Sequence, residues 1–341
     1  MKLRAQNPPH IRSRESNQTV MLDAIIAMLP LYAMATYYYG RRALVLGLFS
    51  VTVTTVIDML CIIARRNVPN IRDLSPTVTG MLLPLLMPAS IRFEVVAAAA
   101  LFGIAVAKHP FGGVGENIFN PAVAGAAFAA VCWPKAMFLY PVPFDRLPVA
   151  VDDTLKLINS PAYTLLLGGA PSTDLLDMLL GNFAGPMGAT NILVLCTCFL
   201  FLVVRKTVSV WMTGAFLTGA ALVAAAVPRA MLTPLYSVGY EMMSGLMLIG
   251  AIFLINDPVT SPKRKLPKIL YGFISGVVSM TFRHLGEYED SLLFAILVMN
   301  AAVWIIDLWG EHFAHALRRK NIELKTNSEV SSAVEENIGV D

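Results

Sequence analysis

Long, uninterrupted apolar runs dominate this sequence and limit the structures that it can form. A helix needs roughly 20 apolar residues to cross a bilayer, and lipid accepts only helices or closed barrels as spanning structures. The chain is 56% hydrophobic and only 14% charged. Its apolar runs are continuous and do not alternate with polar residues, which favours helices over strands. We therefore predict an all-α integral membrane protein.

The apolar runs predict about ten transmembrane helices, some of them broken or re-entrant. Two prolines, Pro84 and Pro88, interrupt the third run, and the fifth run is barely long enough to cross. Such segments are tolerated only where other helices bury them. The predicted spans are 20–38, 43–64, 75–91, 94–108, 120–134, 190–205, 208–227, 237–255, 268–283 and 290–309.

The distribution of Lys and Arg predicts the orientation, because cytoplasmic loops are enriched in both. Most basic loop residues fall on one side, which places both termini in the cytoplasm, and Arg41 and Arg42 are the exceptions. We expect a multi-pass protein of the cell (inner) membrane. The net charge of +3 is small, so we expect no nucleic-acid partner. The predicted regions are a cytoplasmic tail at 1–19, a first transmembrane bundle at 20–134, an extracytoplasmic loop region at 135–189, a second bundle at 190–309 and a cytoplasmic polar tail at 310–341.

Three polar residues stand directly before a proline at the start of an apolar run: Ser75, Asn120 and Asp257. Such a side chain caps the free N–H groups of a helix start, and proline fits the first helical turn. We predict three helix starts, all at the cytoplasmic ends of spans. Their positive dipole ends could converge on an electron-rich or anionic ligand. The alternative is that each pair merely begins a helix.

A glycine-rich loop, from Lys108 to Pro121, precedes the second of these starts. Its glycines would let the backbone approach a flat ligand, and the amides of Asn117 and Asn120 could donate and accept along a ring edge. The loop lacks the flanking strand that a phosphate-binding loop requires, so it does not indicate a nucleotide site.

Asp58 lies inside the second predicted span, where a charge is costly and often serves a transport path. It is our candidate for an ion path, and the alternative is a buried, hydrogen-bonded structural role. The five histidines show no metal-ligand spacing, so we expect no metal site.

Several motifs together resemble those of one family. They are the glycine loop at 111–122, Pro9-His10-Ile11-Arg12, the glycine segment at 180–188, Asp257-Pro258-Val259-Thr260-Ser261-Pro262, and the segments at 283–288 and 294–300. The combination resembles the D subunit of the Rnf-type ion-pumping electron transport complex and the related B subunit of sodium-translocating NADH:quinone reductase. The shorter chain and the N-terminal motif favour the Rnf-type protein.

The resemblance implies a flavin-carrying subunit of a translocase that moves electrons between ferredoxin and NAD while driving sodium ions or protons across the membrane. Such a subunit is not expected to be active alone. One FMN in the family is attached to a threonine on the outer side, and a second, noncovalent flavin such as riboflavin is implied near the glycine loop. We predict that the residues lining this second site are Gly112, Gly113, Asn117, Asn120 and Asp257.

The segment that resembles the attachment motif reads Ser160-Pro161-Ala162-Tyr163-Thr164-Leu165, with Tyr163 at the threonine position. A phosphoester needs a hydroxyl at a defined register, so covalent FMN is in doubt. Thr164, one residue later, is the first candidate for attachment, and Thr190 is the second. The third alternative is that no flavin is attached.

The implied partners are the other subunits of the complex and the lipid bilayer. A cytoplasmic NADH-binding subunit, iron–sulfur subunits and an outer flavin-bearing subunit are expected, because this chain has no nicotinamide fold and no iron–sulfur cysteine set. Two rival functions remain: a passive solute transporter or channel with broken helices, and an assembly subunit without flavin.

Overall fold

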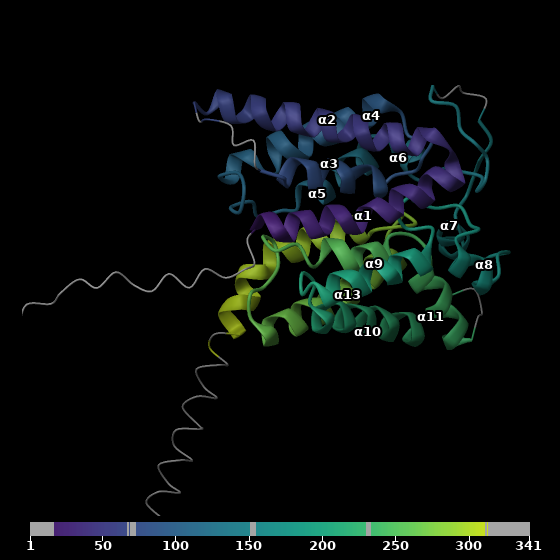
Figure 1. Cartoon of the computed structure of the whole chain (residues 1–341). Helices are drawn as coiled ribbons and strands as arrows, with labels where there is room; N and C mark the ends of the chain where they lie inside the picture. Colours follow the sequence, from purple (N-terminus) through teal and green to yellow (C-terminus); the bar gives the residue numbers. More distant parts are fainter. Residues whose placement is uncertain are drawn as a thin grey trace, which may run out of the picture.

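The computed structural model describes residues 17–66, 68, 73–150, 155–229, 233–310 and 312, and it is a bundle of helices (Figure 1). Most of both predicted tails lies outside these residues, as does the motif at 9–12. The strands in the described part are β1 (Tyr140–Pro141) and β2 (Leu157–Ile158), which form an antiparallel pair. The predicted all-α class is therefore confirmed.

Two groups of helices lie side by side, with α1 in contact with both (Figure 1). The first group is α1 (Asn17–Tyr39), α2 (Arg41–Ala64), α3 (Ser75–Leu85), α4 (Phe93–Leu101) with the π turn η1 (Phe102–Val106) and the 3-10 turn η2 (His109–Phe111), and α5 (Pro121–Cys132). The second is α9 (Ile192–Val204), α10 (Val210–Ala226), α11 (Pro234–Met243), α12 (Met247–Ile249) with the π turn η3 (Gly250–Leu254), α13 (Lys265–Leu285) and the helix Leu292–Gly310. Short helices α6 (Pro134–Met137), α7 (Pro161–Leu166) and α8 (Leu175–Leu180) belong to the connection between the groups.

Each predicted span contains a helix, but the helices differ in length. In the described part of the chain, four are long and apolar enough to cross a membrane: α1, α2, Phe93–Phe111 and Leu292–Gly310. A bent pair, Pro234–Met243 with Met247–Leu254, makes a fifth when counted as one span, with a 71° bend. Helices α3 and α5 have only 11 and 12 residues. That length reaches about 18 Å at most, well short of the hydrocarbon core of about 30 Å.

The end of α3 is held by a buried arginine from α2. Pro88 has no N–H to continue the helix. Beyond this break, Arg42 Nε donates to the carbonyl of Ala89 at 2.8 Å, and its other nitrogens donate to the carbonyls of Ile91 and Val149. Arg42 is only 1% exposed. Its position is therefore explained by the need to satisfy carbonyl groups inside the bundle rather than by membrane orientation.

The break between α11 and α12 has charged partners on both sides. Arg283 Nη1 donates to the carbonyl of Glu241 at 2.8 Å, near the end of α11. The Asp290 carboxylate accepts from the N–H of Leu246, at the start of α12. A cation thus faces the negative end of one half-helix and an anion faces the positive end of the next, which matches the helix dipoles.

Helices α10 and α13 pack through small residues. A Cβ atom added at Gly276 would overlap the carbonyl oxygen of Phe216, and one added at Gly272 would overlap that of Met212. Small residues allow this backbone contact, which drives helix association in lipid. Gly214 of α10 differs, because a Cβ atom there would meet nothing within 4 Å.

We predict that Gly276→Ala destabilises the protein and that Gly214→Ala does not. The Gly276 methyl group must push α10 and α13 apart, which should lower the free energy of unfolding by about 1–3 kcal/mol. Gly214→Ala should change it by less than about 0.5 kcal/mol. Unfolding of the purified protein in mixed detergent micelles measures both. Equal effects of the two substitutions would contradict the packing account.

Candidate functional site

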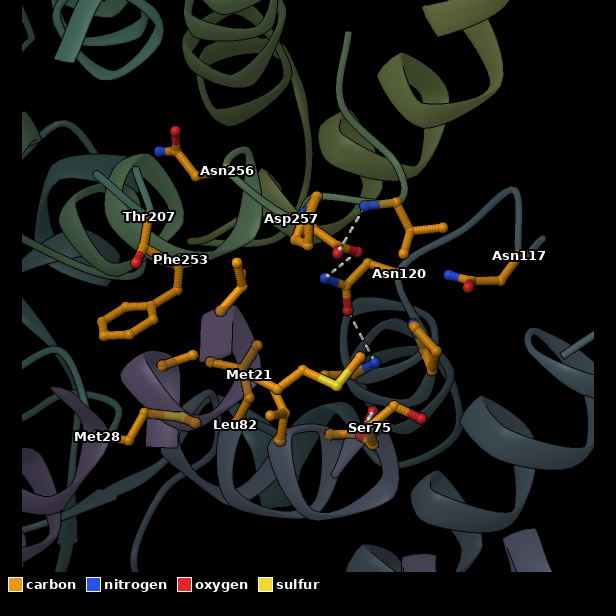
Figure 2. Close-up of a pocket in the computed structure, with 18 of the residues that line it drawn as sticks. Met21, Met28, Ser75, Leu82, Asn117, Asn120, Thr207, Phe253, Asn256 and Asp257 are labelled. Carbon is orange, nitrogen blue, oxygen red and sulfur yellow. Dashed lines mark hydrogen bonds between the residues drawn. The ribbon is translucent and has the colours of Figure 1, made fainter. Parts of the chain in front are cut away.

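A cavity lies where the two helix groups meet (Figure 2). Its walls come from the start of α1, the start of α3, the glycine loop, the end of α9 and the turn after η3. It encloses about 910 Å³ of space outside the protein atoms, including its open mouth. Apolar lining residues include Met21, Met28, Val78, Leu82 and Phe253, and polar ones include Ser75, Lys108, Asn117, Asn120, Asn256 and Asp257.

Asn120 forms the cap that the sequence predicts. Its Oδ1 accepts from the N–H groups of Ala122 and Val123 at 3.0 and 3.3 Å, and Pro121 occupies the first helical turn of α5. Its Nδ2 donates to Asp257 Oδ2 at 3.1 Å (Figure 2). The predicted helix start at Pro121 is confirmed, and the same side chain joins the two halves of the chain.

Ser75 begins α3, but the prediction that its side chain caps the helix is wrong. Asp73 Oδ1 accepts from the N–H of Ser75 at 2.9 Å, and Asp73 Oδ2 accepts from Ser75 Oγ at 3.1 Å. A carboxylate is the stronger acceptor. The hydroxyl oxygen of Ser75 is therefore available to Lys108, whose Nζ donates to it at 2.7 Å.

The prediction of a helix start at Pro258 is also wrong, because residues 258–260 form a turn and the next helix begins at Lys265. Pro262 has no N–H group, so a helix starting at Pro258 could not form the hydrogen bond it needs there. Asp257 instead organises the turn, accepting from the N–H of Val259 at 3.2 Å and from Thr260 Oγ1 at 3.0 Å. Burial raises the pKa of the Asp257 carboxyl above its ordinary value, although these hydrogen bonds favour the charged form.

The glycine loop divides into a part that faces the cavity and a part that does not. Gly115 and Asn117 lie in the wall. Gly112 and Gly113 lie outside it, and both have positive φ angles, 130° and 105°. Arg65 Nη1 donates to the carbonyl of Gly112 at 3.0 Å. Ligand contact by Gly112 and Gly113 stays a prediction, and the structure gives them a role in turning the chain.

Behind the wall, Asp58 belongs to a buried network. Lys108 Nζ donates to Asp58 Oδ1 at 2.7 Å, and His109 Nε2 lies 2.9 Å from the same oxygen. Asp58, Lys108 and His109 are 3%, 2% and 8% exposed. Asp58 is therefore buried and hydrogen-bonded, as one of the two expectations from the sequence had it. Its role in an ion path stays a prediction.

Several lining residues were not expected from the sequence. Met21 and Phe253 lie in long apolar runs, where nothing distinguishes a cavity residue from a core residue. Lys108 and Asn256 each follow a π turn, η1 or η3. A π turn changes the face on which the next residues lie, and such turns are frequent at functional sites. The available signal was Lys108 itself, a cation at the end of an apolar run.

The candidate attachment residues lie in a different part of the molecule. Thr164 is half-buried in α7, and its Oγ1 donates to the carbonyl of Ser160 at 3.3 Å. Thr190, just before α9, is only 1% exposed. Tyr163 N–H donates to Ser160 Oγ at 3.0 Å, so Ser160 caps α7. The threonine position of the motif is thus the third residue of a capped helix.

The length of helix α1 gives the distance between the cavity and the region of the candidate attachment residues. Met21 lines the cavity, whereas Tyr38, 17 residues later in the same helix, donates its hydroxyl to the carbonyl of Leu180 at the end of α8. The 17 residues correspond to about 26 Å of helix. The cavity and the glycine segment at 180–188 are therefore about one hydrocarbon thickness apart.

Within the described ranges, no group of three or more His, Cys, Asp or Glu side chains could hold a metal ion. The cavity instead combines apolar walls with amide, ammonium and carboxylate groups. Apolar walls with a few polar groups are typical of sites that bind organic molecules.

Fold and cavity define a multi-pass helical membrane protein with a cavity between two helix groups. The model of the NQR2, RnfD, RnfE family matches residues 4–313, and the chain belongs to this family.

Curated relatives agree over nearly the whole chain. It is 28% identical to the D subunit of the Na(+)-translocating ferredoxin:NAD(+) oxidoreductase complex of Acetobacterium woodii, covering 95% of this chain and 99% of that one. It is 29% identical to the D subunit of the proton-translocating ferredoxin:NAD(+) oxidoreductase complex of Clostridium ljungdahlii, with 91% and 95% covered. The D subunit of the ion-translocating oxidoreductase complex of Alcanivorax borkumensis is 27% identical, with 94% and 99% covered.

Near the attachment segment, we predict that Glu289→Gln stabilises the protein in a pH-dependent way. Ser160 Oγ donates to Glu289 Oε2 at 2.8 Å, and burial raises the pKa of Glu289 from 4.5 to about 7. The protonated form therefore contributes stability below the unfolded pKa, and this contribution is lost as the pH rises through about 7. The neutral variant should exceed wild type by up to about 3 kcal/mol at alkaline pH.

Thermal melting of both proteins at pH 5 and pH 8 measures this effect. The melting curves should nearly coincide at pH 5 and separate at pH 8. A stability difference independent of pH would contradict the assigned titration of Glu289.

Proposed function

We propose that this chain is a flavin-carrying membrane subunit of a complex that couples electron transfer between ferredoxin and NAD to sodium-ion or proton translocation. Family membership and the names of the relatives support the complex and its reaction. The observation that carries the flavin assignment is the cavity in which the glycine loop, the start of α5 and the Asp257 turn meet.

The cavity residues fit an isoalloxazine ring. Met21, Leu82 and Phe253 supply apolar surface for the two faces of a flat ring. Asn117 Nδ2 donates to the carbonyl of Phe119, which leaves its Oδ1 available to a ligand N–H group. The Asp257 carboxylate is a second acceptor at the cavity wall. A bound flavin would supply the transfer of one or two electrons, and the protein would hold and tune it.

Two positive features would favour negative charge on the ligand. The first turn of α5 presents the positive end of a helix dipole. Lys108 brings an ammonium group to the wall beside Ser75. Both would stabilise a ring that has gained electrons and so raise its reduction potential. Asp257 acts in the opposite direction when charged.

Covalent FMN, if attached, would use Thr164 rather than Thr190. Thr164 is half-buried in a short helix, and its hydroxyl donates to a single carbonyl. Thr190 is buried, so an attaching enzyme would have no access to its hydroxyl in the folded chain. The proposed noncovalent flavin in the cavity does not depend on either threonine, or on Tyr163.

The expected partners and location follow from the same assignment. We expect a cytoplasmic NADH-binding subunit, iron–sulfur subunits and an outer flavin-bearing subunit, with both termini of this chain in the cytoplasm and the chain in the inner membrane. One relative is named for sodium translocation and another for proton translocation. The coupling ion therefore does not follow from family membership.

Two rival functions make different predictions. A passive transporter with broken helices would conduct solute in liposomes without a redox partner. An assembly subunit would leave the complex without flavin at this site. The apolar walls and the oxidoreductase names of the relatives favour the flavin-carrying role over both.

We predict that Met21→Trp empties the flavin site. The larger side chain would occupy the space of the ring, and overpacking of this size should lower the noncovalent flavin content of the purified complex by about tenfold. Acid release after gel filtration, followed by chromatography of the released flavin, measures the noncovalent flavin that the complex retains.

The matched control is Leu48→Trp, because Leu48 lies on α2 with 61% of its side chain exposed. This variant should retain the wild-type flavin content. Full flavin content in the Met21→Trp complex would contradict the assigned cavity.

For covalent flavin, we predict a fluorescent band in a denaturing gel that Thr164→Val abolishes and Thr190→Val leaves unchanged. The physical reason is the burial of the Thr190 hydroxyl. Loss of the band in Thr190→Val would contradict the assignment. Absence of any band in wild type, with flavin still released by acid, would restrict the chain to noncovalent flavin.

A further inference from the structure

We propose that His109, Asp58 and Lys108 form a proton-transfer chain that leads from the protein surface to the cavity, with Lys108 as the proton donor to the bound ligand. The proposal rests on the proposed function, because the ligand that takes the proton is the flavin. It adds a source for the proton that a reduced ring can take up.

The three side chains form a continuous hydrogen-bonded path. Lys108 Nζ and His109 Nε2 bind the same atom, Asp58 Oδ1, at 2.7 and 2.9 Å. Lys108 also lines the cavity. All three residues are at most 8% exposed, so bulk water does not compete with these contacts. The cavity end of the path is therefore Lys108 Nζ.

The outer end of the path is the His109 ring. His109 lines a second, open hollow together with Cys61, Ala64, Arg65 and Pro110. Its Nδ1 atom is buried and has no hydrogen-bond partner in the described part of the protein. An imidazole with one nitrogen bound to a carboxylate and the other free can take up a proton on one side and release one on the other. Water in the hollow is the available proton source, and it reaches the buried Nδ1 when the ring moves toward the hollow.

The other charged groups near Lys108 and His109 do not provide a more direct route for the proton. Arg65 donates to the carbonyls of His109 and Gly112 at 3.0 Å, and a guanidinium does not release its proton in proteins. The exposed Glu116 lies against Gly112. Asp73 is reached from Lys108 only through the Ser75 hydroxyl.

The proton balance is complete without a further reactant. The ammonium of Lys108 gives one proton to a ligand that has received electrons from a partner subunit, and the amine is left neutral. His109 passes its Nε2 proton to Asp58, and Asp58 passes a proton to the Lys108 amine. As the Nε2 proton leaves, His109 takes a replacement at Nδ1 from hydronium in the hollow. The first tautomer returns when the ring turns into the hollow, where Nε2 takes a proton from water as Nδ1 gives one up. One proton has moved from the surface to the ligand, and no side chain is oxidised or reduced.

The same geometry argues against Asp58 as a sodium ligand in this state. The ammonium of Lys108 already neutralises the carboxylate at 2.7 Å. A sodium ion would have to displace a buried partner, which leaves an uncompensated ammonium behind. A proton moves along the existing hydrogen bonds without such displacement.

The decisive variant is His109→Gln in the complete purified complex. The glutamine amide can still donate to Asp58, but it cannot take up and release a proton. Stopped-flow reduction by ferredoxin with a pH-indicator dye measures proton uptake. We expect the uptake phase to slow by about 100-fold, while the flavin content and the midpoint potential stay at wild-type values. The control is His284→Gln, another histidine beside a buried carboxylate, Glu241, and it should keep the wild-type rate.

Chemical rescue separates proton transfer from a structural role. In His109→Ala the hollow gains room for a small base, and added imidazole should restore the uptake rate. Wild-type uptake in a flavin-loaded His109→Gln complex, or no rescue of His109→Ala by imidazole, would overturn the relay alone. If Met21→Trp does not lower the flavin content of the complex, the proposed function is overturned. The relay then also loses its proton acceptor.

Discussion

Backbone groups at the ends of interrupted helices must find partners inside the protein, and this constraint organises the whole structure. Asn120 meets it most directly, because it caps α5 and binds Asp257, a residue 137 positions away. Arg42 satisfies carbonyl groups beyond α3. Arg283 and Asp290 do so at the break of the bent pair. Arg42, Arg283 and Asp290 are thus buried charges whose partners are backbone groups at interrupted helix ends.

The same arrangement creates the cavity. The first turns of α3 and α5 lie in the cavity wall, together with residues of α1, α9 and the turn after η3. Hydrogen bonds between segments hold both helix starts, because Lys108 donates to Ser75 and Asn120 donates to Asp257. A preorganised wall of this kind would add little reorganisation energy when charge develops on a ligand. Proposed electron transfer and proposed proton supply both depend on this rigidity, since Lys108 and Ser75 belong to the wall and to the buried network together.

Local signals in the sequence predicted much of this structure. The apolar runs located the helices, Pro84 and Pro88 located the interruption after α3, and Asn120-Pro121 located a capped start. These local signals could not predict interactions between residues that are far apart in the sequence. Asp58 looks isolated in the sequence because Lys108 and His109 lie 50 and 51 residues away. The turn at Pro258 resembles a helix start until Pro262 is considered. Met21 and Phe253 could not be distinguished from ordinary core residues, since cavity position depends on packing between segments far apart in sequence.

The most direct test of the central claim is a cryo-electron microscopy map of the complete complex in its oxidised form. Our account predicts planar, three-ring density in the cavity, with its faces against Met21, Leu82 or Phe253 and its polar edge toward Asn117 and Asp257. Acyl-chain density filling this cavity, with every flavin of the complex located elsewhere, would contradict it.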